Sequence, residues 1–174
     1  MSKSSMPSPV AAARLCLCHR RCCGNLWQTP HSKGRKMSEQ IQGQCLCGAV
    51  RFHGKILPGR GGGVCHCGQC RRWASGPFMA VRFEGGVTFD ADDALTWFQS
   101  SGHGERGFCS RCGSSLFWRA PGDGNDVAVS ISTLPEDHGL EIMEHIWVDD
   151  QPGWYAFADD TPRRTAADVL GTSD

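Results

Sequence analysis

Seven cysteines in the body of the chain fall into three short clusters, and their spacing limits what the chain can fold into. The clusters are Cys45-Leu46-Cys47, Cys65-His66-Cys67-Gly68-Gln69-Cys70 and Cys109-Ser110-Arg111-Cys112. Two cysteines separated by one residue of an extended strand point to the same face, and two cysteines on either side of a tight turn converge. Zinc binds thiolates at about 2.3 Å in a tetrahedral array. The three clusters therefore predict metal sites.

Seven ligands divide into one site of four cysteines and one site of three. Four cysteines complete a structural zinc site, whereas three leave one coordination position for water or substrate, as catalytic zinc sites do. Disulfides explain the pattern less well, because the chain has 11 cysteines, we recognise no secretory signal, and a C-x-C pair is too tight for an internal bridge. We therefore expect two Zn²⁺ per chain and a reducing, cytoplasmic compartment.

Spacing alone leaves two ways to divide the seven cysteines. In one, the C-x-x-C pairs of the second and third clusters form a zinc ribbon, and the remaining three cysteines come from distant segments. In the other, the first cluster joins the third, and Cys65, Cys67 and Cys70 form a compact trio. Local geometry favours the second division, because Cys65 and Cys67 project to one face of a strand and Cys70 returns to that face from the following turn.

Length and charge narrow the class of protein. A chain of 174 residues is long enough for one domain with a core, and no segment approaches the roughly 20 apolar residues of a membrane span. Residues 1–36 hold seven of the 18 Lys and Arg and none of the 18 Asp and Glu, so the remainder has a net charge of −7. This acidic body argues against nucleic-acid binding. We expect neither a nucleic-acid nor a membrane partner, and the sequence leaves the oligomeric state open.

The basic segment of residues 1–36 is interpreted as a disordered or artefactual N-terminal extension. Its acid-free composition is also typical of organelle-targeting peptides, which is the second interpretation, and its short apolar run, interrupted by Arg14, argues against a secretory signal. Translation starting at Met37 is an alternative, because a well-patterned domain follows that residue. The segment's own cysteines lack a core-like pattern around them and are interpreted as incidental: Cys16, Cys18, Cys22 and Cys23.

Short apolar segments separated by glycine-rich turns predict a mainly β domain from residue 44 onward. The expected strands are residues 49–52, 78–83, 87–89, 95–98, 115–119, 127–131 and 145–148. The expected separators are residues 59–63, 85–86, 102–107 and 121–126. We expect one helical turn after Cys67, another at residues 135–137, and a loose tail at residues 161–174. Because the strands are short, zinc should supply part of the folding free energy, on the order of 10 kcal/mol.

The three clusters and their flanking residues resemble the glutathione-dependent formaldehyde-activating enzyme family, which includes the centromere protein V type. The matching segments are residues 43–52 (GQCLCGAVRF), 65–72 (CHCGQCRR), 106–116 (RGFCSRCGSSL) and 145–148 (HIWV), with Trp154-Tyr155. The resemblance covers roughly residues 41–160 and implies a small zinc-stabilised β-tent-type domain with few helical turns. It implies a structural zinc on Cys45, Cys47, Cys109 and Cys112. It also implies a catalytic zinc on Cys65, Cys67 and Cys70, the division that local geometry favours.

The resemblance also implies a carbon–sulfur lyase that acts on an adduct of formaldehyde and a small thiol such as glutathione. The catalytic zinc would hold the sulfur or the hydroxymethyl oxygen of the substrate. Arg71 and Arg72 are candidates to bind the carboxylates of the thiol, and His103 is a further candidate in a glycine-rich loop. His66 should face away from the two ligands that flank it and is interpreted as a packing residue, as is His145. No general acid or base is identified.

Two other functions remain as alternatives. The chain could be a zinc-stabilised binding module without catalysis, which a second site closed by His103 would support. It could also be a zinc-ribbon nucleic-acid binder, based on Arg71 and Arg72, although the acidic body opposes this interpretation.

Overall fold

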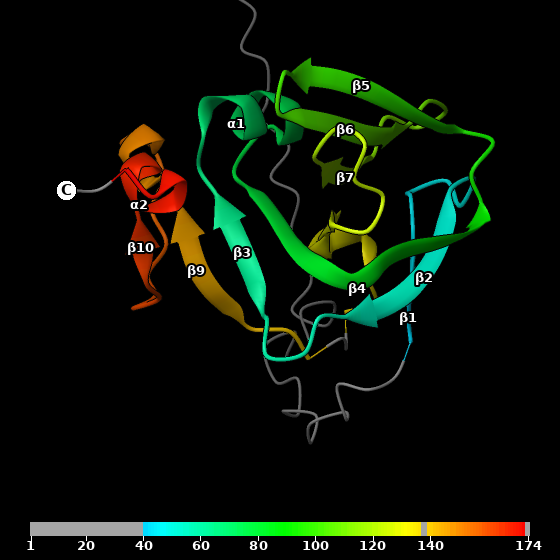
Figure 1. The fold of residues 1–174 in the computed structure, drawn as a ribbon, viewed down its shortest axis with the longest axis horizontal. Coiled ribbons are helices and arrows are strands. Elements are labelled where there is room, and N and C mark those ends of the chain that lie inside the picture. Colours follow the sequence, from blue (N-terminus) through cyan, green and yellow to red (C-terminus); the bar gives the residue numbers. More distant parts are fainter. Residues whose placement is uncertain (1–39, 137–138, 173–174) are drawn as a thin grey trace, which may run out of the picture. The chain divides into compact units, whose positions relative to one another are not determined.

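The computed structural model describes residues 40–136 and 139–172 (Figure 1). The predicted N-terminal extension, its four cysteines and the alternative start at Met37 lie outside the described residues. The strands in the described part are β1 (Ile41–Gln44), β2 (Arg51–Ile56), β3 (Gly62–Cys65), β4 (Phe78–Ala91), β5 (Leu95–Ser101), β6 (Gly104–Cys109), β7 (Ser115–Arg119), β8 (Val127–Ser130), β9 (Ile142–Ile146) and β10 (Arg163–Arg164). The helices are α1 (Gly68–Ala74), α2 (Ala166–Leu170) and the short 3-10 turns η1 (Ile131–Thr133) and η2 (Val148–Asp150). The prediction of a mainly β chain is confirmed, as is the helical turn after Cys67.

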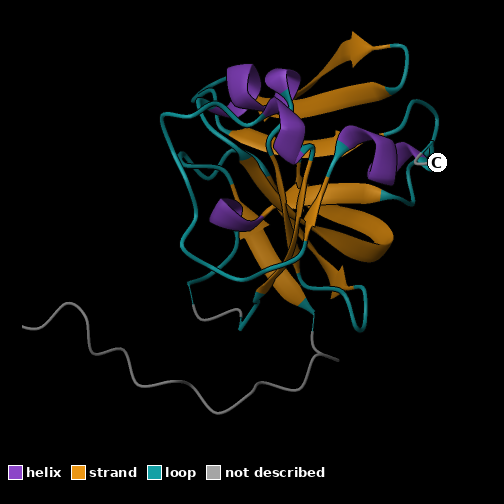
Figure 2. Cartoon of the chain, turned by 90° about the vertical axis from the view of Figure 1, so that its left-hand side faces the viewer, coloured by secondary structure: helices purple, strands orange, loops and turns teal. Residues whose placement is uncertain are grey.

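The strands form one sheet whose main path runs β10-β9-β3-β4-β8-β7-β6-β5, and the β1–β2 hairpin joins this path through β4. Most neighbours are antiparallel, whereas β9 lies parallel to both β3 and β10. Figure 1 shows β3 and β9 side by side, with α1 connecting the end of β3 to the start of β4. The helices are short and lie outside the strands (Figure 2). In the described residues, no helix has the length and apolar character needed to span a bilayer.

Strand β4 is 14 residues long and bends in its middle, which allows it to pair with three strands. Its residues 78–82 pair with β3 and β8, and residues 83–91 pair with β2. The bend lies at Gly85 and Gly86, which have φ values of 70° and 86°, a conformation that only glycine adopts without steric cost. We predicted two strands separated by a turn at these glycines, and the structure instead has one continuous, bent strand.

The separators predicted at residues 59–63 and 102–107 are turns only in their first residues, because β3 begins at Gly62 and β6 begins at Gly104. Their glycines lie where neighbouring side chains approach the backbone closely. A Cβ at Gly62 would lie 2.5 Å from Ile131 Cδ1, and a Cβ at Gly104 would lie 2.5 Å from Trp118 Nε1. The glycines therefore mark close packing within the sheet rather than turns. Strand β1 was not predicted either.

The core is built from aromatic and β-branched side chains of the sheet, and it extends to the first and third cysteine clusters. Phe52 and Phe117 are fully buried and meet edge to face, with ring centroids 4.9 Å apart. Burying a side chain of this size contributes roughly 1.5–3 kcal/mol. Cys45 is 1% exposed and Cys109 is not exposed, and both pack in the same core. The packing of the sheet thus fixes one sulfur of each of these two clusters.

The C-terminal residues 161–172 hold more regular structure than the loose tail that we expected. Strand β10 pairs in parallel with β9, and Thr165 caps helix α2. The Thr165 hydroxyl accepts a hydrogen bond from the Asp168 N–H at 3.3 Å, and the Asp168 carboxylate accepts one from the Thr165 N–H at 2.8 Å. The helical turn expected at residues 135–137 extends beyond the described residues, and η1 precedes it.

Candidate metal centres

Four cysteines from two tight turns bring their sulfur atoms together. The sulfurs of Cys45, Cys47, Cys109 and Cys112 all lie within 4.8 Å of one another. The Sγ atoms of Cys45 and Cys47 are 3.6 Å apart, and those of Cys47 and Cys109 are 3.8 Å apart. Four sulfurs bound to one tetrahedral zinc would be about 3.8 Å from each other, whereas a disulfide would bring two of them to about 2.05 Å. The donor atoms and their spacing therefore fit zinc.

Each half of this four-cysteine cluster is a turn that contains a glycine in the left-handed region. Gly48 has a φ of 73° and Gly113 a φ of 74°, and each glycine N–H donates to the carbonyl of the cysteine that opens its turn. Ser114 connects the two halves. Its hydroxyl accepts a hydrogen bond from the Leu46 N–H at 3.1 Å and lies 3.2 Å from the Cys112 sulfur. These contacts hold the thiols in place through backbone geometry.

The trio of Cys65, Cys67 and Cys70 forms a second group, whose sulfurs also lie within 4.8 Å of one another. Cys65 ends β3, Cys67 is the N-cap of α1, and Cys70 lies in the first turn of that helix. The Cys67 sulfur accepts a hydrogen bond from the Cys70 N–H at 3.4 Å. Among the described residues, no fourth His, Cys, Asp or Glu belongs to this group. The structure thus brings together the two sets of cysteines that local geometry favoured.

The three thiols of the trio have very different pKa values because they share hydrogen bonds. Hydrogen bonds from Cys65 and then from Cys70 lower the pKa of Cys67 to about 2. The pKa of Cys65 is raised well above its usual value by its hydrogen bonds with Cys67 and then Cys70, and by burial. The hydrogen bond with Cys65 lowers the pKa of Cys70, but the hydrogen bond with Cys67, burial and the Cys67 charge outweigh it and raise the value to about 11. At neutral pH the metal-free trio therefore carries one negative charge.

A buried arginine lies beside the trio. Arg106 on β6 is only 3% exposed, and its Nη2 lies 3.8 Å from the Cys70 sulfur and 3.3 Å from the Gln69 side-chain oxygen. Its Nη1 is buried with no hydrogen-bond partner, and no carboxylate in the described residues forms an ion pair with it. A buried cation requires a compensating anion. The trio supplies that negative charge, and the sequence had left the role of Arg106 open.

The three residues predicted to contact the substrate, Arg71, Arg72 and His103, differ in their surroundings. The Arg71 Nε donates to the His66 carbonyl at 2.9 Å and so supports the loop that joins two ligands. Arg72 is exposed on α1. His103 is exposed in the turn between β5 and β6, where its N–H donates to the Ser101 hydroxyl at 3.2 Å. His103 belongs to neither cysteine group of the described residues.

His66 lies between two ligands of the trio but turns its ring into the protein, as predicted. The ring is fully buried, with hydrogen bonds to Tyr155 and His145. Burial, followed by the charges of His145 and nearby arginines, lowers the pKa of His66 to about 4. Sequence reasoning gave no role to Tyr155 or to Asp159, whose carboxylate forms a hydrogen bond with His145. The fact that Tyr155 is the single tyrosine of the chain was the available signal.

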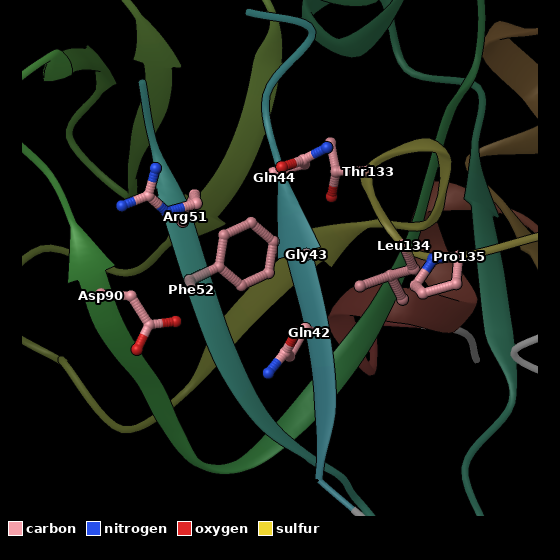
Figure 3. Close-up of a pocket in the computed structure, with 9 residues that line it drawn as sticks. All are labelled: Gln42, Gly43, Gln44, Arg51, Phe52, Asp90, Thr133, Leu134 and Pro135. Carbon is pink, nitrogen blue, oxygen red and sulfur yellow. The ribbon is translucent and has the colours of Figure 1, made fainter. Parts of the chain in front are cut away.

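A separate pocket of about 610 Å³ lies between the β1–β2 hairpin and the segment that follows η1 (Figure 3). It is lined by Gln42, Gly43, Gln44, Arg51, Phe52, Asp90, Thr133, Leu134 and Pro135. None of these residues is a cysteine. Thiol chemistry of the kind that the two clusters support therefore lies outside this pocket.

Comparison with known proteins identifies a family and two relatives. A family model described as glutathione-dependent formaldehyde-activating enzyme matches residues 40–150. A Schizosaccharomyces pombe protein named as an uncharacterized lyase is 28% identical over 131 residues, which cover 75% of this chain and 95% of that protein. A Halomonas elongata protein, named as a candidate glutathione-dependent formaldehyde-activating enzyme, is 29% identical over 127 residues, which cover 66% of this chain and 78% of that protein.

Among solved structures, the chain is similar to a Rhodobacter sphaeroides protein with 23% sequence identity and a TM-score of 0.48. The alignment covers 55% of this chain and 89% of that protein.

Proposed function

The chain belongs to the glutathione-dependent formaldehyde-activating enzyme family of carbon–sulfur lyases, and we propose that it is a two-zinc lyase acting on the S-hydroxymethyl adduct of glutathione. One observation carries the proposal. The trio offers three thiols within 4.8 Å of one another and no fourth protein ligand among the described residues. A zinc ion bound there would keep one coordination position for a molecule from outside.

The reaction breaks the bond between the thiol sulfur and the hydroxymethyl carbon and releases the aldehyde. A zinc ion at such a site would bind the thiol in its thiolate form, which is the nucleophilic form. The trio orients this position, and Arg106 offsets the negative charge beside Cys70. The four-cysteine cluster would hold the second zinc, as a structural ion that joins two turns.

Two arginines follow the trio directly and support glutathione as the thiol. Glutathione carries two carboxylates, and the guanidinium fork matches a carboxylate well. Arg72 is exposed, and no ion pair of the described residues involves it. Arg71 is anchored through its Nε to the His66 carbonyl. We propose both as carboxylate contacts, while His103, on the β5–β6 turn, stays a prediction without a placed role. A reducing, cytoplasmic compartment would keep the thiols free.

The test is a comparison of metal content and turnover between the wild type and Cys67→Ser. Serine is a good N-cap, so this variant keeps the cap of α1 while it removes the thiolate. We expect two zinc ions in the wild type and one in the variant, as measured by elemental analysis. We expect exchange between glutathione and its hydroxymethyl adduct, measured by NMR, to be accelerated by the wild type alone.

Two results would contradict the proposal. A variant with one zinc that turns over at the wild-type rate would remove the trio from catalysis. A two-zinc wild type that gives no acceleration, and whose cobalt-substituted form shows no spectral response to glutathione, would make the chain a zinc-stabilised binding module.

A further inference from the structure

Helix α1 and strand β6 meet beside the trio through two side-chain contacts (Figure 1). Arg106 Nη2 donates to the Gln69 side-chain oxygen at 3.3 Å. Two residues further along β6, the Phe108 ring meets the Trp73 ring of α1 edge to face, with ring centroids 5.6 Å apart. Cys70 lies between Gln69 and Trp73 in the helix, and its sulfur is 3.8 Å from Arg106 Nη2. The contact thus places the guanidinium directly against a sulfur of the trio.

This α1–β6 contact contains buried hydrogen-bond donors that have no acceptor. Arg106 is 3% exposed, and its Nη1 is buried without a partner among the described residues. Trp73 Nε1 is a second buried donor in the same contact without such a partner. Both groups can only donate hydrogen bonds, and a buried donor without a partner costs free energy. The surroundings of Cys70 therefore favour negative charge.

The positive charge of Arg106 is balanced by sulfur and not by a carboxylate. No ion pair of the described residues involves Arg106, and the neighbouring Glu105 is paired with Arg119 at 2.7 Å. A zinc ion held by three thiolates has a net charge of −1, and the guanidinium brings the total to zero. A further negative charge would therefore enter neutral surroundings, whereas without Arg106 it would enter negative ones.

The charge of Arg106 acts over a range that includes a ligand from outside. Sulfurs bound to one tetrahedral zinc are about 3.8 Å apart. A fourth sulfur beside Cys70 would therefore lie within about 8 Å of Arg106 Nη2. At that distance, two charges at a partly buried site attract each other strongly enough to shift an equilibrium by on the order of tenfold. The charge of an exposed arginine has less effect, because water and salt screen it.

We propose that Arg106 determines the specificity of the trio, and that its charge makes the site select a thiolate over an uncharged sulfur. The inference rests on the proposed function and deepens it, because it concerns the substrate of the same site. The S-hydroxymethyl adduct presents an uncharged sulfur, whereas free glutathione can bind as a thiolate. Arg106 thus stabilises the side of the reaction on which the sulfur is charged.

In the cleavage direction, negative charge develops on sulfur as the carbon–sulfur bond breaks. The electron pair of the C–S bond stays on sulfur, the hydroxyl proton passes to water, and the electrons of the O–H bond complete the C=O bond. Arg106 attracts the charged sulfur but not the uncharged sulfur of the adduct. Its stabilisation is therefore larger in the transition state than in the bound substrate.

The test compares glutathione with S-methylglutathione, which has the same carboxylates but a sulfur that cannot ionise. Isothermal titration calorimetry at one pH, on protein saturated with zinc, gives the affinity for each ligand. The wild type should bind glutathione more tightly, and Arg106→Met should reduce the ratio of the two affinities by on the order of tenfold. Arg106→Lys keeps the positive charge and should retain most of the preference. A merely structural role would change both affinities alike and leave their ratio as it is.

A matched control is Arg72→Met, which removes an exposed arginine of the same helix. Because both ligands carry the same carboxylates, this change should affect their affinities equally and leave the ratio unchanged. Elemental analysis of every variant should find two metal ions per chain under the conditions of the titration. Circular dichroism shows whether each variant has kept the fold.

Three results would overturn the inference. The first is an unchanged ratio in an Arg106→Met protein that holds two metal ions. The second is an equal loss in Arg106→Met and Arg106→Lys, which would assign the effect to shape and not to charge. The third, which needs no variant, is a wild type that binds both ligands with equal affinity. If the preference depends on Arg106 but the wild type does not accelerate exchange of the adduct, the proposed lyase activity fails while the role of Arg106 in thiolate selection stands.

Discussion

Removing zinc from the trio and restoring it at different pH values should reveal that two protons leave the trio for each ion that enters. In the metal-free trio, Cys67 has a pKa of about 2 and is already ionised at neutral pH. Cys70 has a pKa of about 11, and the pKa of Cys65 is also raised, so both are protonated. Zinc binds all three as thiolates. The entering ion therefore displaces the protons of Cys65 and Cys70.

The size of the effect follows from this count. Each displaced proton makes the apparent affinity for zinc rise tenfold per pH unit, so two protons give about 100-fold, or roughly 2.7 kcal/mol, per unit. The sign is positive, because raising the pH removes the competing protons. Between pH 6 and pH 8, both below the pKa of Cys70, the affinity should rise by about 10⁴.

The assay starts from protein that has kept its four-cysteine zinc and lost the other. Competition with a fluorescent zinc chelator at pH 6, 7 and 8, corrected for protonation of the chelator, gives the slope of log affinity against pH. Cys67→Ser identifies the site that is being titrated, because it should lose this binding. A slope close to one or three would refute the reasoning, since the trio would then hold a different number of protons from the one that its hydrogen bonds dictate.

Two further predictions concern residues close to the site and within the sheet. Arg106→Met removes the buried charge 3.8 Å from the Cys70 sulfur. Because Arg106 lowers the pKa of Cys70, its loss should weaken zinc binding by the trio at pH 7 by on the order of tenfold. The same chelator competition measures this affinity, and an unchanged value would contradict the prediction. Gly104→Ala would place a Cβ 2.5 Å from Trp118 Nε1, whereas Gly102→Ala in the same turn meets nothing within 4 Å. Gly104→Ala should lower the free energy of unfolding by about 1–3 kcal/mol, whereas Gly102→Ala should leave it within about 0.5 kcal/mol of the wild-type value. Denaturant unfolding measures both, and equal losses would show that the Trp118 contact is irrelevant.

The trio was predictable because its grouping depends on local chain geometry, whereas the four-cysteine cluster joins residues 62 positions apart and was predicted from the resemblance and from the cysteines that the trio leaves. A C-x-C pair and a C-x-x-C pair converge whatever the rest of the chain does, so the trio could be placed from Cys65, Cys67 and Cys70 alone. The strand pattern was predictable where a short apolar run is bounded by polar residues, as at residues 115–119 (SLFWR), which are the bounds of β7. These features need only near neighbours in the sequence.

The rest could not be predicted because it depends on partners that are distant in the sequence. Gly62 and Gly104 were interpreted as turn residues, but they are strand residues that leave room for Ile131 and Trp118. The hydrogen bond between Tyr155 and His66 joins residues 89 positions apart, and nothing in the local sequence of either residue indicates the other. The burial of Arg106 likewise depends on α1 and β6 meeting.

Strand β6 carries Arg106 and ends at Cys109, so a single strand contributes to both cysteine groups. Its far end is tied to the four-cysteine cluster, and its middle places a guanidinium against the trio. Because Cys109 is fully buried in the core, an empty four-cysteine cluster should leave β6 in its place. The guanidinium should consequently stay beside the trio, so that each cysteine group can be loaded with metal without waiting for the other.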